Sequence, residues 1–149
     1  MKMINQSLEP VLRLAVERGL QNYEHIRDGG FLNDIYLFYD EDNQLITLFD
    51  DMERELFTLD LNFEHVVSET GDMQQEVRDT AKYVIGEMEL VDAFHQEFIA
   101  KPFTVSMVDS DFIILEELIF IDDETMKLDG NLMAGWNKEL DEFLKNLMN

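Results

Sequence analysis

Carboxylates are the side chains best able to do chemistry in this chain, and they gather in short runs. The sequence holds 33 Asp and Glu against 11 Lys and Arg, which gives a formal net charge of −22. Clustered carboxylates can bind a cation, pair with Arg or Lys of a partner, or act together as general acid and base. The runs that we take as candidate partner-binding residues are Asp40, Glu41, Asp42, Asp50, Asp51, Glu53, Glu55, Asp109, Asp111, Asp122, Asp123 and Glu124.

The acidic runs do not match a known metal-binding pattern. The run that starts at Asp40 has Asp at positions 1 and 3 of an EF-hand loop, but Gln44 and Leu45 stand where the loop needs Asp or Asn and then Gly. The Asp92-x-x-His95 pair is related to the Glu-x-x-His pairs of di-iron bundles, which need two such pairs and two more Glu. We therefore predict no metal site and no cofactor.

The sequence also lacks the common catalytic motifs. It has no cysteine, and its four serines and three histidines form neither a Gly-x-Ser-x-Gly elbow nor a His-Glu-x-x-His pair. No Gly-x-Gly-x-x-Gly and no Walker lysine is present for binding phosphates. We predict no catalytic residue, although an enzyme that uses an unrecognised carboxylate cluster remains an alternative.

Two adjacent acids interrupt the most apolar segment of the chain. Glu116 and Glu117 lie within residues 112–121, which otherwise read as a strand buried on both faces. Neighbouring residues on a strand point to opposite faces, so one of these acids would enter an apolar environment that raises its pKa. The alternative is a bulge that lets both side chains reach water. The two acids are therefore candidate buried carboxylates.

Hydrophobic periodicity defines the elements that must position these residues. Spacings of three and four predict helices over 7–28, 71–100 and 132–148, with a bend expected at Gly86. Alternating or continuously apolar runs predict strands. The strands expected are 31–39, 44–49, 55–61, 103–108, 112–121 and 126–128. The sequence thus predicts one α+β domain over residues 1–149, in the order α-βββ-α-βββ-α, with helices packed on an antiparallel sheet made of two meander blocks.

The charge is unevenly distributed along the chain. Residues 1–30 contain equal numbers of acidic and basic residues, so the whole excess lies in residues 31–149. A surface of this sign repels nucleic acid and anionic lipid, and it attracts basic proteins. We expect no direct contact with nucleic acid or membrane. No apolar leader precedes the first helix, and we expect a cytoplasmic protein.

The hypothesis that follows is an interaction module without enzymatic activity. Bacterial immunity proteins, other inhibitors and nucleic-acid mimics use carboxylates in this way to meet a basic partner protein. The alternatives are an enzyme or metal-binding protein built on a carboxylate cluster, and an adaptation of the whole surface to high salt. A homodimer through the neutral helix 7–28 is left open.

Overall fold

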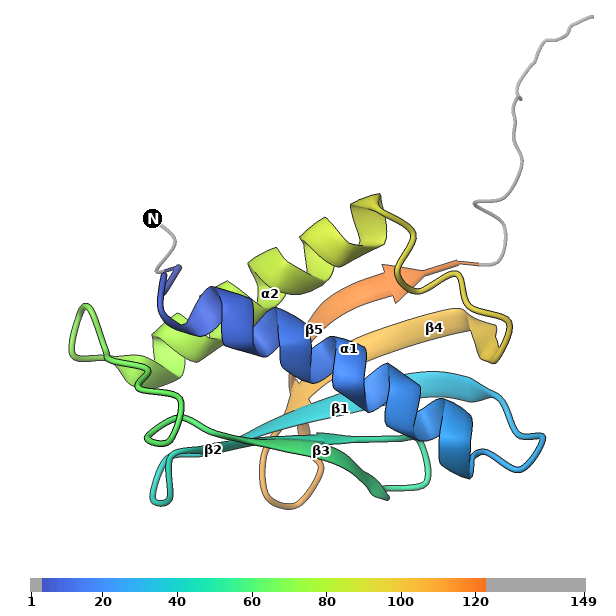
Figure 1. Cartoon of the computed structure of the whole chain (residues 1–149), viewed down its shortest axis with the longest axis horizontal. Helices are drawn as coiled ribbons and strands as arrows, with labels where there is room; N and C mark the ends of the chain where they lie inside the picture. The colour runs from blue at the N-terminus through green and yellow to red at the C-terminus, as the bar shows by residue number, and fades with distance from the viewer. Residues whose placement is uncertain (1–3, 123–149) are drawn as a thin grey trace, which may run out of the picture.

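Residues 4–122 fold into a mixed sheet with two helices on one face (Figure 1). The structure is a computed structural model that describes residues 4–122. The elements run α1 (Leu8–Ile26), β1 (Leu32–Asp40), β2 (Leu45–Phe49), β3 (Glu55–Asp60), α2 (Met73–Leu90), β4 (Ile99–Val108) and β5 (Ile114–Ile121). The α+β class predicted from the sequence is confirmed.

The strands lie in the order β3-β2-β1-β4-β5. The pairs β1–β2, β2–β3 and β4–β5 are antiparallel, as the short polar turns predicted. The central pair β1–β4 is parallel, so the prediction of a purely antiparallel sheet was wrong. A long connection that contains α2 separates the two meanders, and such a connection allows the chain to return and pair in parallel. The described order is α-βββ-α-ββ, and the predicted strand 126–128 and helix 132–148 lie outside the described residues.

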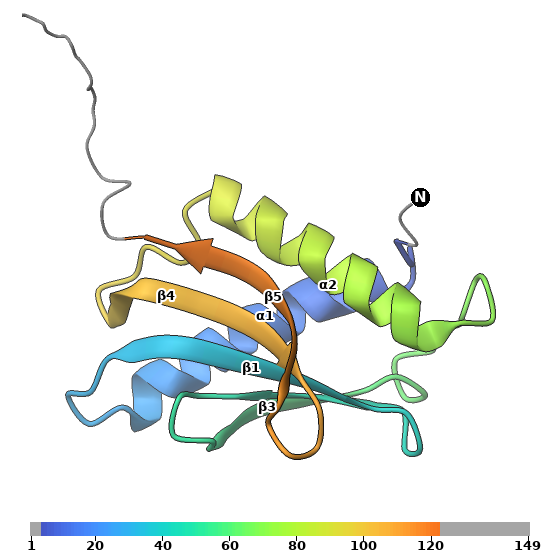
Figure 2. The same ribbon diagram turned by 180° about the vertical axis from the view of Figure 1, so that it is seen from behind.

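Both helices cover the same face of the sheet, and the core lies between them and the strands (Figures 1 and 2). Alternate residues of the central strand, such as Ile35 and Leu37, point into this layer and are fully buried. Leu8 and Leu12 of α1 are fully buried in the same core, as the predicted helical spacing requires. Gly19 lets α1 approach closely, because a β-carbon there would lie 3.1 Å from Cδ1 of Leu48.

The second helix is shorter than predicted. It passes Gly86 without a break and ends at Leu90, so the predicted extension to residue 100 was wrong. The backbone turns at Asp92, which has φ +61°, and the N–H of Ala93 donates to the carbonyl of Met88 at 3.0 Å. The helical spacing continued past the end of the helix because Phe94 and Phe98 enter the core from an irregular segment.

Candidate binding site: an acidic cleft at one end of the sheet

Strand directions divide the acidic runs between the two ends of the sheet. Because β1 and β4 are parallel, the turns that follow them, residues 41–44 and 109–113, lie at the same end. The turn after β2, residues 50–54, and the end of β5 at Asp122 lie at the opposite end. The described acids therefore form two groups and do not share one edge.

The end that carries the turns after β1 and β4 has a cleft of about 570 Å³. This volume is within the usual range of ligand pockets in proteins, about 300–1,000 Å³. The lining residues are Phe38, Tyr39, Asp40, Glu41, Asp42, Asn43, Gln74, Met107, Val108, Asp109, Ser110 and Leu115. Four of them are acids and none is Lys or Arg, so the lining combines negative charge with apolar side chains.

Two of the four acids hold the turns in place. Asp40 accepts hydrogen bonds from the backbone N–H of Asn43 at 3.3 Å and from its side-chain amide at 2.8 Å. Asp109 accepts from the backbone N–H of Asp111 at 2.9 Å and of Ile113 at 3.0 Å. Asp side chains commonly stabilise turns in this way. These two carboxylates build the walls of the cleft and remain on its surface.

The other acids of this end are available to a partner. Glu41, Asp42 and Asp111 are exposed, and their carboxylates make no hydrogen bond or ion pair with another residue between positions 4 and 122. Glu41 and Asp42 line the cleft, whereas Asp111 lies on the neighbouring turn. This part of the predicted set thus presents free carboxylates beside a hollow in the surface.

The acids at the opposite end have other roles. Asp50 is fully buried and accepts from the backbone N–H of Met52 and of Arg54, both at 2.9 Å, and from Nε of Arg54 at 2.8 Å. It therefore stabilises the turn after β2 and is not accessible to a partner. Asp51 accepts from the backbone N–H of Asn33 at 2.9 Å.

Among the remaining acids of that end, Glu53 and Glu55 are exposed and Asp122 is half-buried, while Asp123 and Glu124 lie outside the described residues. Asp34, which the sequence analysis did not select, lies near Asp51. Burial first, and then the negative charge of Asp51, raise the pKa of Asp34. None of the acids of this end lines the cleft beside Glu41 and Asp42.

The two acids within β5 are not deeply buried. The register between β4 and β5 shifts on both sides of them, between Val105 and Ser106 and between Met107 and Val108, which is the bulged alternative to a regular strand. Glu117 is exposed. Glu116 is half-buried under α2, where it pairs with Arg78 at 3.5 Å and Lys82 at 3.1 Å. Of the two alternatives that the sequence left open at these acids, the structure has the bulge and not a deeply buried carboxylate.

The carboxylate that is buried and perturbed is Glu76 of α2, which sequence reasoning missed. It is 1% exposed, and it accepts from the amide of Asn5 at 2.6 Å, the hydroxyl of Ser68 at 2.8 Å, the hydroxyl of Thr70, and the backbone N–H groups of Thr70 at 2.7 Å and Glu69 at 3.1 Å. Burial alone would raise its pKa, but these hydrogen bonds outweigh burial and lower the pKa to about 2. The set of donors indicates a structural role, in which Glu76 joins α1, α2 and the loop between β3 and α2.

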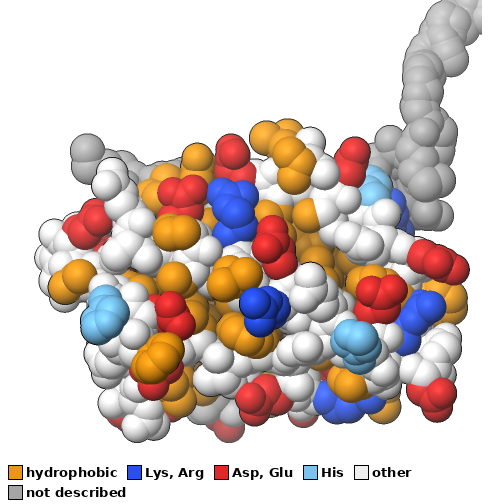
Figure 3. All heavy atoms as spheres, in the orientation of Figure 1, with side chains coloured by type: hydrophobic (Ala, Val, Ile, Leu, Met, Phe, Trp, Pro, Cys, Tyr) orange, Lys and Arg blue, Asp and Glu red, His pale blue; other side chains and the backbone are white. Residues whose placement is uncertain are grey.

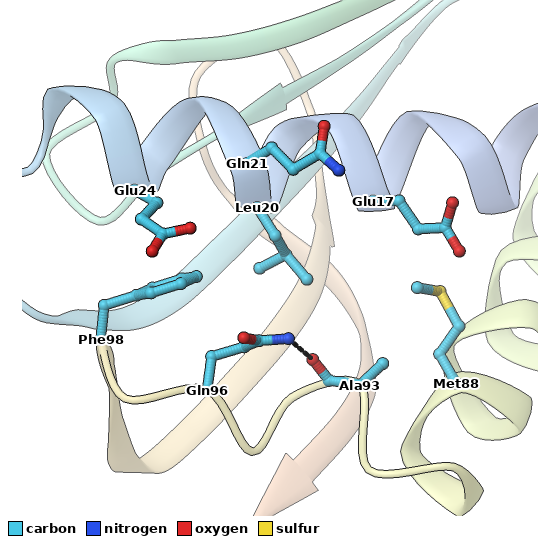
Figure 4. Close-up of a pocket in the computed structure, with 8 residues that line it drawn as sticks. All are labelled: Glu17, Leu20, Gln21, Glu24, Met88, Ala93, Gln96 and Phe98. Atoms are coloured by element: carbon cyan, nitrogen blue, oxygen red, sulfur yellow. Dashed lines mark hydrogen bonds between the residues drawn. The ribbon is translucent and has the colours of Figure 1, made fainter.

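A smaller cavity of about 220 Å³ lies between α1 and the segment that follows α2 (Figure 4). Glu17, Leu20, Gln21 and Glu24 border it from α1, and Met88, Ala93, Gln96 and Phe98 from the other side. Its apolar walls are already buried by their neighbours, since Leu20, Met88 and Phe98 are at most 6% exposed. On this helix-covered face, acidic, basic and apolar side chains are interspersed (Figure 3). The cavity therefore lacks the concentrated charge of the acidic cleft.

No protein-family model matches the chain, and no curated protein or solved structure is significantly similar to it. Between residues 4 and 122, no three His, Asp or Glu side chains are grouped so that they could hold a metal ion. None of the described helices is long and apolar enough to cross a membrane.

Proposed function

We propose that the protein is an interaction module that binds a basic partner protein through the acidic cleft. The observation that carries this proposal is the position of Glu41 and Asp42 in the lining of the 570 Å³ cleft, where their carboxylates make no hydrogen bond or ion pair with another described residue. In the usual case, surface acids lie scattered on convex turns. Here the acids border a concave surface, which is the shape that an inserted side chain needs.

The lining of the cleft fits a long basic side chain. Arg and Lys bury an aliphatic stem against apolar surface and keep the charged head among polar groups. In the cleft, Phe38 and Leu115 offer apolar surface for the stem, and Glu41 and Asp42 offer acceptors for the head. A carboxylate accepts the two N–H groups of a guanidinium side by side, which gives direction as well as charge.

The net charge of −22 supports the same function at longer range. A field of one sign raises the rate at which an oppositely charged protein finds its site, and it does so most at low ionic strength. An inhibitor or immunity protein against a nuclease, or a mimic of nucleic acid, has this design because its carboxylates take the places of phosphates on the basic surface of the target. We assign the protein to this class of function.

Affinity capture with two variants of equal charge tests the proposal. In Glu41→Gln/Asp42→Asn the cleft loses two charges, and in Glu53→Gln/Glu55→Gln the opposite end of the sheet loses two. We expect wild-type protein and the control variant to retain the same basic protein from a lysate of the source organism at low salt. The cleft variant should bind the captured protein about fivefold more weakly, because two charge pairs together contribute about 1 kcal/mol.

The proposal also predicts release of the captured protein by salt. Debye screening shortens the range of the interaction from about 30 Å at 0.01 M salt to about 8 Å at 0.15 M. Equal binding by the two variants would remove the cleft as the site. An affinity that does not change with salt would remove the electrostatic mechanism altogether.

A further inference from the structure

The start of β5 and the turn before it expose three consecutive large apolar side chains. Ile113 is 60% exposed, Ile114 is 59% exposed and Leu115 is 43% exposed. Between residues 4 and 122, no other run of three consecutive large apolar side chains is exposed. Single exposed apolar residues are ordinary on a protein surface, but a patch of them with polar groups around it marks a place where another molecule binds. This run is therefore a candidate for contact with a partner.

All three residues are connected to the lining of the acidic cleft. Leu115 lines the cleft itself. Ile114 is paired in the strand register with Val108, which also lines the cleft. The backbone N–H of Ile113 donates to the carboxylate of Asp109 at 3.0 Å, and its carbonyl accepts from the backbone N–H of Asp109 at 3.0 Å. The apolar run and the acidic cleft therefore adjoin each other at one end of the sheet.

A bulge in β5 determines the position of Leu115. Ile114 pairs with Val108 and Glu116 pairs with Met107, so two steps along β5 correspond to one step along β4. Leu115 is the extra residue between these pairs. A bulge redirects a side chain that a regular strand would turn to one of the two faces of the sheet. Here the extra residue lines the cleft, so the irregular backbone presents an apolar side chain next to the carboxylates.

The charges around this apolar surface indicate which partner can cover it. Glu41 and Asp42 have free carboxylates in the lining, and the lining contains no Lys or Arg. A partner with apolar groups alone would bring no positive charge to these carboxylates. A partner with basic groups alone would leave Leu115 and Ile113 in contact with water. A basic residue next to a large apolar residue matches both parts of the surface.

We propose that the acidic cleft recognises two neighbouring residues of the partner, one Arg or Lys and one large apolar residue. This inference rests on the proposed function, because it names the feature of the basic partner that the cleft binds. The basic head reaches the carboxylates of Glu41 and Asp42, and its apolar neighbour packs on Leu115 and Ile113. An apolar anchor surrounded by polar groups is typical of a specific protein interface, whereas a surface that acts by charge alone does not need one.

NMR titration of the isotope-labelled, full-length protein with synthetic peptides tests the proposal. The first peptide is acetyl-Gly-Ser-Arg-Leu-Ser-Gly-amide. The basic analogue has Ser in place of Leu, and the apolar analogue has Ser in place of Arg. At low salt we expect the Arg-Leu peptide to shift the backbone amide signals of residues 40–43, 107–110 and 115. It should bind several-fold more tightly than either analogue, because each analogue lacks one of the two contacts.

Variants assign the apolar contact to a surface. In Leu115→Ser the Arg-Leu peptide should bind no more tightly than the basic analogue, and Ile113→Ser should reduce the preference as well. Neither residue belongs to the hydrophobic core, and the NMR spectrum verifies that each variant is folded. Leu90→Ser is the matched control and should keep the full preference. Leu90 is 78% exposed, and it lies about 24 Å along α2 from Gln74, which lines the cleft.

The outcomes distinguish this inference from the proposed function. If the Arg-Leu peptide and the basic analogue shift the cleft signals with equal affinity, the cleft recognises charge alone, and only the apolar contact is wrong. A preference for the Arg-Leu peptide that survives in both Leu115→Ser and Ile113→Ser would also overturn the inference, because the apolar contact would lie elsewhere. If neither basic peptide shifts these signals, or if the apolar analogue binds as tightly as the Arg-Leu peptide, the proposed function fails as well.

Discussion

Glu76 is the residue on which the fold depends most clearly. Its carboxylate has five donors from two parts of the chain, Asn5 and residues 68–70, and its pKa is lowered to about 2 from an ordinary value of 4.5. A carboxyl whose pKa is lower in the folded state stabilises the protein above its unfolded pKa. That contribution is lost as the pH falls from about 5 toward 2, and for a shift of this size it amounts to about 3 kcal/mol.

We therefore predict that Glu76→Gln lowers the free energy of unfolding by about 3 kcal/mol at pH 7. The amide cannot accept all five hydrogen bonds, and it brings two N–H groups of its own to a site already full of donors. Chemical denaturation of both proteins between pH 7 and pH 3 measures the effect. The difference between them should shrink as the pH falls below about 4.5, because the carboxyl of Glu76 then takes up a proton in the unfolded state while it keeps its charge in the folded state.

The control for this prediction is Glu64→Gln, which changes an exposed acid. It should change stability by less than about 0.5 kcal/mol at any pH in this range. If Glu76→Gln proved as stable as wild type at pH 7, the hydrogen bonds would contribute nothing net to folding.

At the scale of single residues, the sequence predicted which acids lie in turns better than it predicted which acids are buried. The acidic turns at residues 40–42 and 109–111 were correctly recognised as turns. The burial of Asp50 and Glu76 was not predicted, because it depends on donors from Arg54 and Asn5 that only the folded chain brings near. The nearest local signal was the run of Ser68 and Thr70 ahead of α2, which supplies hydroxyl donors to Glu76.

The two helices offer a matched test at the scale of elements. Each has a glycine in its interior, where glycine costs a helix about 1 kcal/mol relative to alanine. A β-carbon at Gly86 of α2 meets no atom within 4 Å, whereas one at Gly19 of α1 meets Leu48 at 3.1 Å. The two positions therefore separate helix propensity from packing.

We predict that Gly86→Ala stabilises the protein by about 0.5–1 kcal/mol, since nothing opposes the gain in propensity. Gly19→Ala should gain less or lose, because Leu48 must move within a close-packed core. Thermal and chemical unfolding of the two variants side by side measure the difference. An equal gain at both positions would show that α1 can move away from the sheet at no cost.

Elements were predicted well where the local pattern matched the local structure. Helix α1 and strands β1 to β3 lie close to the ranges expected from spacing and turn residues. The end of α2 was not predicted, because Phe94 and Phe98 continue an apolar spacing while they enter the core from a non-helical segment. The parallel pairing of β1 with β4 joins residues about 70 apart, and no local pattern carries that information.

At the scale of the whole molecule, the candidate site was predicted only where it depends on composition and not where it depends on the pairing of distant strands. The excess of acid was plain in the sequence, but its division between two ends of the sheet follows from the parallel β1–β4 pair. The cleft at one end needs both Asp40 and Asp109, which lie in different meanders. The sequence therefore predicted the sign of the surface, and the fold determines where that charge meets a hollow.

The net charge of −22 leads to a last prediction, for the stability of the whole molecule. Between residues 4 and 122, few acids pair with Lys or Arg. Most of these ion pairs are at the surface, where each contributes little to stability, so their screening by salt costs the folded state little free energy. Repulsion among the many unpaired acids is then the larger electrostatic contribution, and it disfavours the folded state. Raising sodium chloride from 0.01 M to 1 M shortens the Debye length from about 30 Å to about 3 Å and should raise the midpoint of thermal unfolding by several degrees.

Because the core is of ordinary apolar character, the protein should nonetheless be folded at 0.01 M salt, which a circular dichroism spectrum checks. A chain that unfolds when salt is removed would instead support adaptation to high salt as the reason for its acidity.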